Sequence, residues 1–252
     1  MGSSLFILLA ATLAIAKPSA AAEKKRDIRI VEIEGSVWIR QGNQREWAPI
    51  KLEEGFWPTE EGDAIKTGPA PSRAVLQMDK DNTVEIGHHT IFEIESANFT
   101  WSKFKLMTGR IVSKIEEKLR DANRGVNIVM PSGTLAVRGT EFAAETAQED
   151  GEATDAVAVF EGEVEAQLTK LEGAPSVAVL ADQELDLVIS GEKPSPRAIR
   201  RFEATRKRLD LLRERHKKLR ERWSAIPERR RKAIRRRQEQ IKDRIEKRRH
   251  GQ

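Results

Sequence analysis

The sequence predicts a mainly β protein, in which an all-β domain of the β-helix or β-sandwich type is followed by a basic α-helical arm. Two observations predict the domain: apolar residues alternate with polar ones in short runs, and glycines separate those runs. The third observation predicts the arm. Residues 191–252 hold 25 Lys and Arg against 9 Asp and Glu, a net charge of +16, whereas residues 1–190 hold 20 against 31, a net charge of −11. Segments of such opposite charge are better interpreted as separate modules.

Composition excludes several classes of chemistry. The chain has 252 residues and no cysteine, which excludes disulfide frameworks, thiolate zinc sites, iron–sulfur clusters and thiol catalysis. The hydrophobic share of 38% is low for a fully globular chain, so part of the sequence is expected to build no core.

The first 22 residues predict a secretory signal peptide. Residues 5–16 are apolar and uncharged, but are too short for a spanning helix, which takes roughly 20 residues. Small residues then precede the charged run 23–26, as signal peptidase requires, so cleavage is expected near Ala22 and the mature protein is expected to be periplasmic or secreted. The first four residues contain no Lys or Arg. The alternative is an apolar first helix in a cytosolic protein.

The β domain is expected to span residues 27–190. Alternating apolar residues recur through this region in runs of four to six, which is typical of half-buried strands. Many short strands joined by glycine turns are typical of a sandwich, a barrel or a β-helix. Residues 113–121 interrupt the alternation with apolar residues four apart, which predicts a short helix or an excursion.

Several sequence blocks in this region resemble, in the same order, those of a known domain. Residues 61–68 read Glu-Gly-Asp-Ala-Ile-Lys-Thr-Gly, residues 136–142 read Ala-Val-Arg-Gly-Thr-Glu-Phe, and residues 157–164 read Val-Ala-Val-Phe-Glu-Gly-Glu-Val. They are similar to the G-D-x-I-x-T-G, V-R-G-T-x-F and V-x-V-x-E-G-x-V blocks of the FecR domain, the periplasmic part of iron-dicitrate sensor regulators. The resemblance covers roughly residues 27–167 and implies a β-helix-like all-β fold. Its motif residues are Gly62, Asp63, Thr67, Gly68, Arg138, Gly139, Thr140, Phe142, Glu161 and Gly162.

We interpret these motif residues as structural. Glycine tolerates positive φ and aspartate can accept hydrogen bonds from nearby backbone, so Gly62-Asp63 and the glycine of Glu161-Gly162 suit tight turns. Arg138 stands among apolar neighbours in the sequence, where a charge needs partners. We therefore expect its guanidinium to bind backbone carbonyls or a carboxylate.

The chain also departs from the membrane regulators that carry this domain. Those proteins have a cytoplasmic anti-sigma segment and a spanning helix before the domain, and a small α/β module after it. Here the domain is expected to follow the signal peptide directly, and a basic helix follows the domain. The resemblance therefore implies a free-standing extracytoplasmic FecR-domain protein rather than a sigma-factor regulator.

Residues 191–196 are expected to form a linker, and residues 197–250 a helical arm that is broken near Pro227. The apolar residues of the arm fit a heptad, which predicts a coiled coil with another chain, and hence a homo-oligomer, or a helical hairpin. A further alternative is that the basic arm docks onto the acidic domain of the same chain. The heptad core positions are Phe202, Thr205, Leu209, Leu212, His216, Leu219, Trp223 and Ile226.

The rest of the arm is strongly basic. Such a surface repels itself unless an anionic partner is present. Anionic lipid headgroups, acidic envelope polymers and, for a chain that is not exported, nucleic acid are the candidate partners. The alternative is a solvated, charged coiled coil without an anionic target. The residues expected to contact an anionic partner are Arg229, Arg230, Arg231, Lys232, Arg235, Arg236 and Arg237.

The sequence predicts no enzyme. His88, His89 and Glu93 do not match the metalloprotease spacing and are interpreted as surface residues. The acidic residues of the 60–63 segment lie beside a structural turn, and there is no phosphate-binding loop or nucleophile elbow. We therefore expect no catalytic, cofactor-binding or metal-binding residue.

Together these features predict a non-enzymatic, extracytoplasmic protein. Its β domain would bind a protein partner in the cell envelope, and its arm would hold an anionic surface or self-associate. Two alternatives remain: an envelope signalling component that acts with a membrane regulator, and a basic nucleic-acid-binding protein if the chain is not exported.

Overall fold

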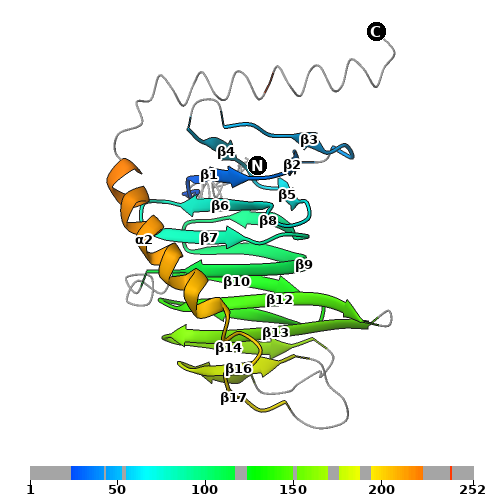
Figure 1. Cartoon of the computed structure of the whole chain (residues 1–252), viewed down its shortest axis with the longest axis vertical. Helices are drawn as coiled ribbons and strands as arrows, with labels where there is room; N and C mark the ends of the chain where they lie inside the picture. The colour runs from blue at the N-terminus through cyan, green and yellow to red at the C-terminus, as the bar shows by residue number, and fades with distance from the viewer. Residues whose placement is uncertain are drawn as a thin grey trace, which may run out of the picture.

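The computed structural model describes residues 24–42, 44–52, 55–116, 124–149, 152–169, 176–187, 194–223 and 239. The expected signal peptide, the break near Pro227 and the basic residues 229–237 lie outside the described residues, as does part of the linker. Within these ranges, 17 strands form one connected network, and helix α2 (Thr205–Trp223) lies across it (Figure 1). The prediction of a mainly β protein is confirmed, and the sheet does not close into a barrel.

The network folds into two layers that share strand β9 (Trp101–Lys114). We call the layer that α2 covers the helix-side sheet and the other layer the open-side sheet. In order, the helix-side sheet contains β17 (Arg197–Ala198), β16 (Gln183–Asp186), β13 (Glu152–Glu161), β12 (Glu141–Glu149), β9, β7 (Asn82–Ile86), β6 (Arg73–Met78), β1 (Ile28–Glu34) and β4 (Trp57–Thr59). The open-side sheet contains β3 (Ala48–Pro49), β2 (Val37–Arg40), β5 (Ala64–Thr67), β8 (Ile91–Ala97), β9, β10 (Gly125–Met130), β11 (Gly133–Val137), β14 (Glu163–Leu168) and β15 (Val177–Leu180).

Gly109 lets strand β9 pass from one sheet to the other. Before it, β9 pairs with β8 and, in parallel, with β10; from Gly109 onward it pairs with β12 and β7. Gly109 has φ +90°, and a Cβ at this position would overlap the side chain of Thr90. Only glycine meets both conditions without strain. The helix or excursion expected at 113–121 is wrong at its start, because Ser113 and Lys114 are the last two residues of β9.

The main core fills the space between the two sheets. Its inward side chains come from both layers; Phe92 and Phe104, for example, stack with ring centroids 5.4 Å apart. On the open-side sheet the outward residues are more exposed, so β14 alternates between exposed and buried positions. This is the period-two pattern from which the sequence predicted half-buried strands.

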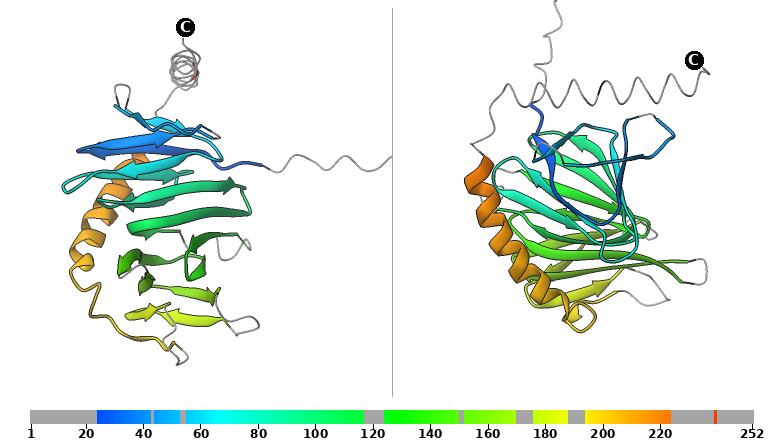
Figure 2. Two further views of the ribbon diagram at one scale, coloured as in Figure 1. Left: turned by 90° about the vertical axis from the view of Figure 1, so that its right-hand side faces the viewer. Right: turned by 45° about the horizontal axis from the view of Figure 1, so that its top comes forward.

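Where α2 packs on its outer face, the helix-side sheet is buried on both faces, as in β7 (Figure 2, right). Strand β13 divides its side chains accordingly: Val157 and Val159 point into the main core, whereas Ala156 and Ala158 lie under the helix. The short alanine side chains let the helix approach closely. The second core contains Val112, Ala143, Ala156, Ala158 and Phe160 from the sheet, and Phe202, Leu209 and Leu212 from the arm.

The buried face of α2 is the face that the heptad predicts, but it packs on the protein's own sheet. Thr205, Leu209, Leu212, His216 and Leu219 are the buried residues of the helix. Over residues 205–223 the structure therefore shows the alternative in which the arm docks onto its own domain, instead of the expected coiled coil or hairpin. The expected arm boundary at 197 is also corrected, because Arg197 and Ala198 pair with β16 before the helix begins. Among the described residues, no helix is long and apolar enough to cross a membrane.

Candidate functional site

The first motif block builds a turn between β4 and β5 by side-chain capping. Asp63 is buried, and its carboxylate accepts hydrogen bonds from the backbone N–H of Gly42 at 3.0 Å and of Glu60 at 2.9 Å. Gly62 supplies the positive φ, +86°, that the turn requires. The block thus joins the 40s loop to the β5 strand.

The end of the same block ties two further loops together. The Thr67 hydroxyl donates to the carbonyl of Gly87 at 2.5 Å and accepts from the N–H of Thr90 at 3.0 Å. The N–H of Gly68 donates to the carbonyl of Ser36 at 2.9 Å. These contacts lie inside the domain, as expected of residues that maintain the fold.

The second and third motif blocks meet at one turn. Gly139 and Gly162 both have positive φ, +65° and +83°, and a Cβ on Gly162 would lie 2.5 Å from the carbonyl oxygen of Gly139. The Thr140 hydroxyl donates to the carbonyl of Glu163 at 2.8 Å. Phe142 lies in the main core. Two blocks that are separate in the sequence therefore form one close-packed unit.

Arg138 differs from the other residues of its block, and the expectation for it is corrected. It is exposed rather than enclosed, and its guanidinium carbon lies 4.7 Å from the ring centroid of Trp101. No hydrogen bond or ion pair joins its side chain to any residue in the described ranges. Arg138 directly follows β11 and the inward Val137, and side chains of an extended chain alternate between faces, which is why its apolar neighbours in the sequence misled the prediction.

Trp101 has room beside Arg138 because residue 125 is glycine. Gly125 pairs with Trp101 across the β9–β10 ladder, and a Cβ on it would lie 2.5 Å from the indole ring. The indole therefore lies over the backbone of β10 and presents a ring face to the guanidinium, a favourable cation–π arrangement.

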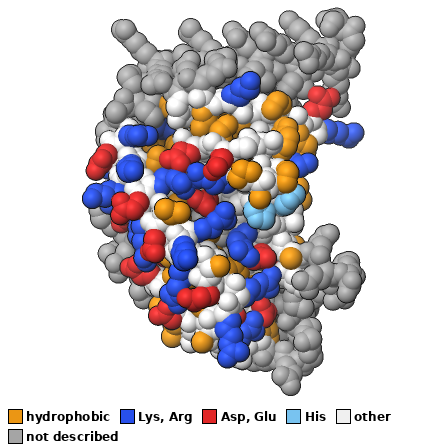
Figure 3. All heavy atoms as spheres, viewed as in Figure 1, with side chains coloured by type: hydrophobic (Ala, Val, Ile, Leu, Met, Phe, Trp, Pro, Cys, Tyr) orange, Lys and Arg blue, Asp and Glu red, His pale blue; other side chains and the backbone are white. Residues whose placement is uncertain are grey.

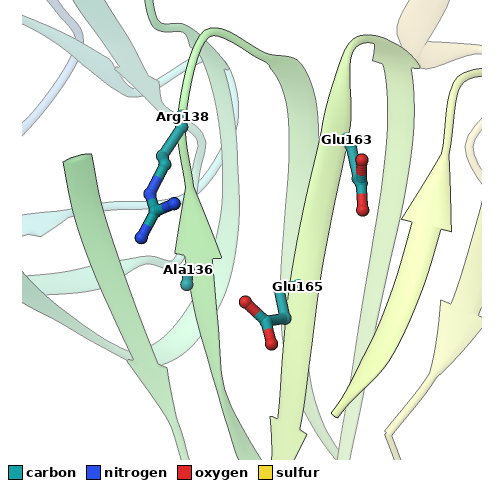
Figure 4. A pocket seen from close by; sticks show the side chains of 4 residues that line it. All are labelled: Ala136, Arg138, Glu163 and Glu165. Atoms are coloured by element: carbon teal, nitrogen blue, oxygen red, sulfur yellow. The ribbon is translucent and has the colours of Figure 1, made fainter. Parts of the chain in front are cut away.

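Arg138, Ala136, Glu163 and Glu165 line a shallow pocket of about 130 Å³ on the outer face of the open-side sheet. Figure 4 shows the Arg138 guanidinium and the Glu165 carboxylate on either side of Ala136. Glu165 accepts a hydrogen bond from Ser176 at 2.5 Å. We call this site the Arg138 pocket. It offers a cation beside two carboxylates, so it is suited to binding charged and hydrogen-bonding groups.

On the opposite side of the molecule, α2 is held by ion pairs to acidic residues of the helix-side sheet. Arg213 Nε donates to the buried Glu141 at 2.9 Å, and Arg215 Nη1 donates to the buried Glu85 at 2.7 Å. Arg220 Nε pairs with Asp81 at 2.8 Å. Basic and acidic side chains alternate over this face (Figure 3). Sequence reasoning missed these acidic partners, although Glu85 and Glu141 stand as single charges within strand-like runs.

The other candidates from the sequence lie apart from both regions. His88 and His89 are exposed neighbours whose rings meet edge to face, and no group of three or more metal-binding side chains occurs in the described part of the chain. Glu61 pairs with Lys25 at 2.7 Å and accepts from the Ala97 N–H at 2.7 Å. These hydrogen bonds hold the pKa of Glu61 below its ordinary value.

Comparisons with known proteins agree with the motif blocks. Residues 63–165 match the family described as FecR protein. Two crystal structures of a "putative anti-sigma factor" from Parabacteroides distasonis ATCC 8503 are similar to this chain, each with a TM-score of 0.46 and 13% identity over 56% of this chain and 62% of theirs. This chain thus covers less than two thirds of that protein. No curated protein sequence matches. The motif blocks, the turns that they build and the family match agree that residues 63–165 of this chain are similar to the FecR family.

Proposed function

We propose that this chain is a non-enzymatic binding protein of the cell envelope, whose FecR domain engages a protein partner with the outer face of its open-side sheet. The observation that supports this proposal is the exposure of Arg138. Its neighbours in the motif form turn and core contacts, whereas its guanidinium remains at the surface beside Glu163 and Glu165. A domain that keeps a charged group in an open pocket is equipped for recognition.

The two faces of the domain would then have different roles. The helix-side sheet is covered by α2 and its ion pairs, whereas the open-side sheet carries the Arg138 pocket. The presence of a FecR domain supports a role of the envelope-signalling type, in which the partner would be a membrane regulator. Beyond Trp223, the chain continues into the basic residues 229–237, for which we propose an anionic lipid or envelope polymer as the target, or self-association.

Charge reversal of Arg138 tests the proposal. In the native host, a photo-crosslinking residue at Ala136 should trap a partner, and adding Arg138→Glu should abolish that crosslink. Arg222→Glu is the matched control, because Arg222 is exposed on α2 and far along the chain from the pocket. A crosslink that survives Arg138→Glu, or one that Arg222→Glu removes equally, contradicts the proposed role of the pocket.

Export is tested separately, by fractionation of the host and the intact mass of the recovered protein. A periplasmic species lacking about 22 residues is expected if the N-terminal segment is a signal peptide. A full-length cytoplasmic species contradicts the envelope assignment and favours nucleic acid as the target of the basic arm.

A further inference from the structure

Three cationic side chains gather around the ring of Phe99, in the loop between β8 and β9. Lys24 Nζ lies 4.3 Å from the ring centroid, and the guanidinium carbons of Arg124 and Arg26 lie at 4.4 Å and 5.7 Å. We call these four residues the Phe99 cluster. It lies outside the motif blocks and outside the Arg138 pocket.

Three separate parts of the chain bring the cluster together. The segment before β1 is fixed by two backbone hydrogen bonds, from the Arg26 N–H to Ala97 at 2.7 Å and from the Phe99 N–H to Lys24 at 2.8 Å. Arg124 directly precedes β10, and the N–H of Gly125 donates to Thr100 at 2.9 Å. The positions of the cations are therefore set by backbone hydrogen bonds of the fold.

The charges of the cluster are not balanced within the described residues. Asp79 pairs with Arg26 at 2.9 Å, while no ion pair is formed there by Lys24 or Arg124. Lys25, the remaining cation of this segment, is directed to Glu61 instead. Cations held around one ring repel one another unless an anion lies among them.

Arg26 adds a second, independent observation. Its side chain is 0% exposed, yet its Nε and Nη2 atoms have no hydrogen-bond partner. Burial lowers the pKa of Arg26, Asp79 opposes this effect, and the charge of Arg124 lowers the pKa further. A buried guanidinium with two unused donors is costly and is normally satisfied by an acceptor.

We propose that the Phe99 cluster binds a phosphate group. A phosphate carries up to two negative charges and several acceptor oxygens, so it can receive the free donors of Arg26 and neutralise Lys24 and Arg124 at the same time. Lys24 is exposed and Arg124 is partly exposed, which leaves the cluster open to solvent on their side. The proposal goes beyond the partner-binding role of the Arg138 pocket, because none of its residues lines that pocket.

Thermal unfolding of the mature chain, recovered from the host, tests the proposal with inorganic phosphate as the probe. Phosphate should raise the melting temperature, relative to chloride at equal ionic strength, in a saturable manner. The double substitution Lys24→Gln with Arg124→Gln should weaken the apparent affinity by about tenfold or more, because charge-assisted hydrogen bonds are lost. Both positions are at least partly exposed, so the variant should fold.

The matched control removes the same two charges from α2, with Lys217→Gln and Arg222→Gln. Both of these residues are exposed. The control should keep the full response to phosphate. If phosphate raised the melting temperatures of the two double variants equally, the proposed site would be wrong, because the effect would then depend only on net charge.

A second arm of the experiment separates free phosphate from the phosphate of a lipid headgroup. The same variants are sedimented with vesicles of phosphatidylglycerol, and with phosphatidylcholine as the uncharged comparison. The site is assigned to a lipid headgroup if inorganic phosphate does not raise the melting temperature and the wild-type protein binds the anionic vesicles. In that case the Lys24/Arg124 variant should lose vesicle binding and the control variant should keep it. The proposal is overturned if neither inorganic phosphate nor the anionic vesicles bind. It is also overturned if, with both probes, the two double variants change binding equally.

Discussion

A buried histidine on α2 and a buried glutamate that pairs with α2 both have lowered pKa values in the folded protein, so helix docking is expected to depend on pH. His216 is buried, with Nδ1 2.8 Å from the Thr83 hydroxyl on β7. Burial lowers the pKa of His216, and the positive charges of Lys114 on β9 and of Arg220 lower it further. The negative charges of Glu116 and Asp81 raise it but do not cancel the decrease. The neutral imidazole is therefore the form that fits the folded protein.

Glu141 acts in the same direction at lower pH. Burial raises its pKa, but hydrogen bonds from Arg213 and Lys114, together with their charges, outweigh burial and hold the pKa below its ordinary value. A carboxyl group with a lowered pKa contributes stability above its ordinary pKa, about 4.3, and loses that contribution as pH falls further. Acid is therefore expected to weaken the helix–sheet contact in two successive pH ranges, one for each group.

The His216 window gives the first prediction. Because its pKa is lowered in the folded protein, the unfolded chain takes up a proton first, and the free energy of unfolding should fall as pH drops below about 6.5. His216→Gln should be less stable at pH 7.5 by about 1–3 kcal/mol, since Thr83 and the helix lose a fitted partner. It should also lose this part of the pH dependence. Urea unfolding at pH 7.5 and pH 5.5 measures both.

His88→Gln is the control for this prediction, because His88 is exposed. That variant should keep the wild-type stability and the wild-type slope with pH. If His216→Gln keeps the same slope as the wild type, the histidine does not couple docking to pH.

At the scale of elements, α2 has two halves that are held by different forces. Its N-terminal half buries Leu209 and Leu212 against small and apolar side chains of the sheet, which stabilises by ~1.5–3 kcal/mol for each fully buried side chain. Its C-terminal half buries one leucine, Leu219, and is held mainly by Arg213, Arg215 and Arg220, which pair with carboxylates. Trp223 then lies over the buried Arg29 of β1, 3.9 Å from ring centroid to guanidinium.

Strand β9 is the element on which the two-layer arrangement depends, and Gly109 gives the second prediction. Gly109→Ala should destabilise by ~1–3 kcal/mol more than Gly42→Ala. Both substitutions place alanine at positive φ, which costs ~1–2 kcal/mol, but only the Cβ at 109 overlaps a neighbour, Thr90, whereas nothing lies within 4 Å at 42. Overpacking adds about 1–3 kcal/mol. Urea unfolding compares the two variants, and equal costs would show that β9 does not require glycine for close approach.

At the scale of the whole molecule, the protein has three layers: the open-side sheet, the helix-side sheet and α2 (Figure 2). The acidic domain and the basic arm are therefore not independent modules over the described residues. Their opposite charges pair within the molecule, because arginines of the arm neutralise carboxylates that are buried in the sheet. A buried carboxylate without such a partner would be strongly destabilising.

The third prediction follows from this architecture. A chain that ends at Trp223 keeps α2 and serves as the reference. A chain that ends at Glu203 should be much less stable and prone to aggregate, because it uncovers Phe160 and the alanine face of β13 and leaves Glu85 and Glu141 without their arginines. Size-exclusion chromatography and thermal unfolding distinguish the two. If the shorter chain is monomeric and as stable as the full chain, α2 is not part of the domain.

The sequence alone determined the mainly β architecture, the FecR motif blocks and the buried face of α2. Each of these features depends on residues that are close together in the sequence. Alternation determines which side of a strand is apolar, and a heptad determines which face of a helix is apolar. Turns need glycine and aspartate at fixed positions. The positions of Leu209, Leu212, His216 and Leu219 on one buried face were therefore predictable from spacing.

Only the tertiary structure decided what covers that face and where the charges go. Periodicity specifies that a face is buried but not its partner, so the heptad was equally compatible with a second helix and with the sheet that covers it here. The same limit applies to Arg138 and to Arg26. Arg138 has apolar neighbours in the sequence, yet it lies exposed just after β11, whereas Arg26 belongs to a charged run and is nevertheless enclosed by long-range contacts beside Phe99. Burial of a charge depends on contacts between distant residues, and these form only when the chain folds.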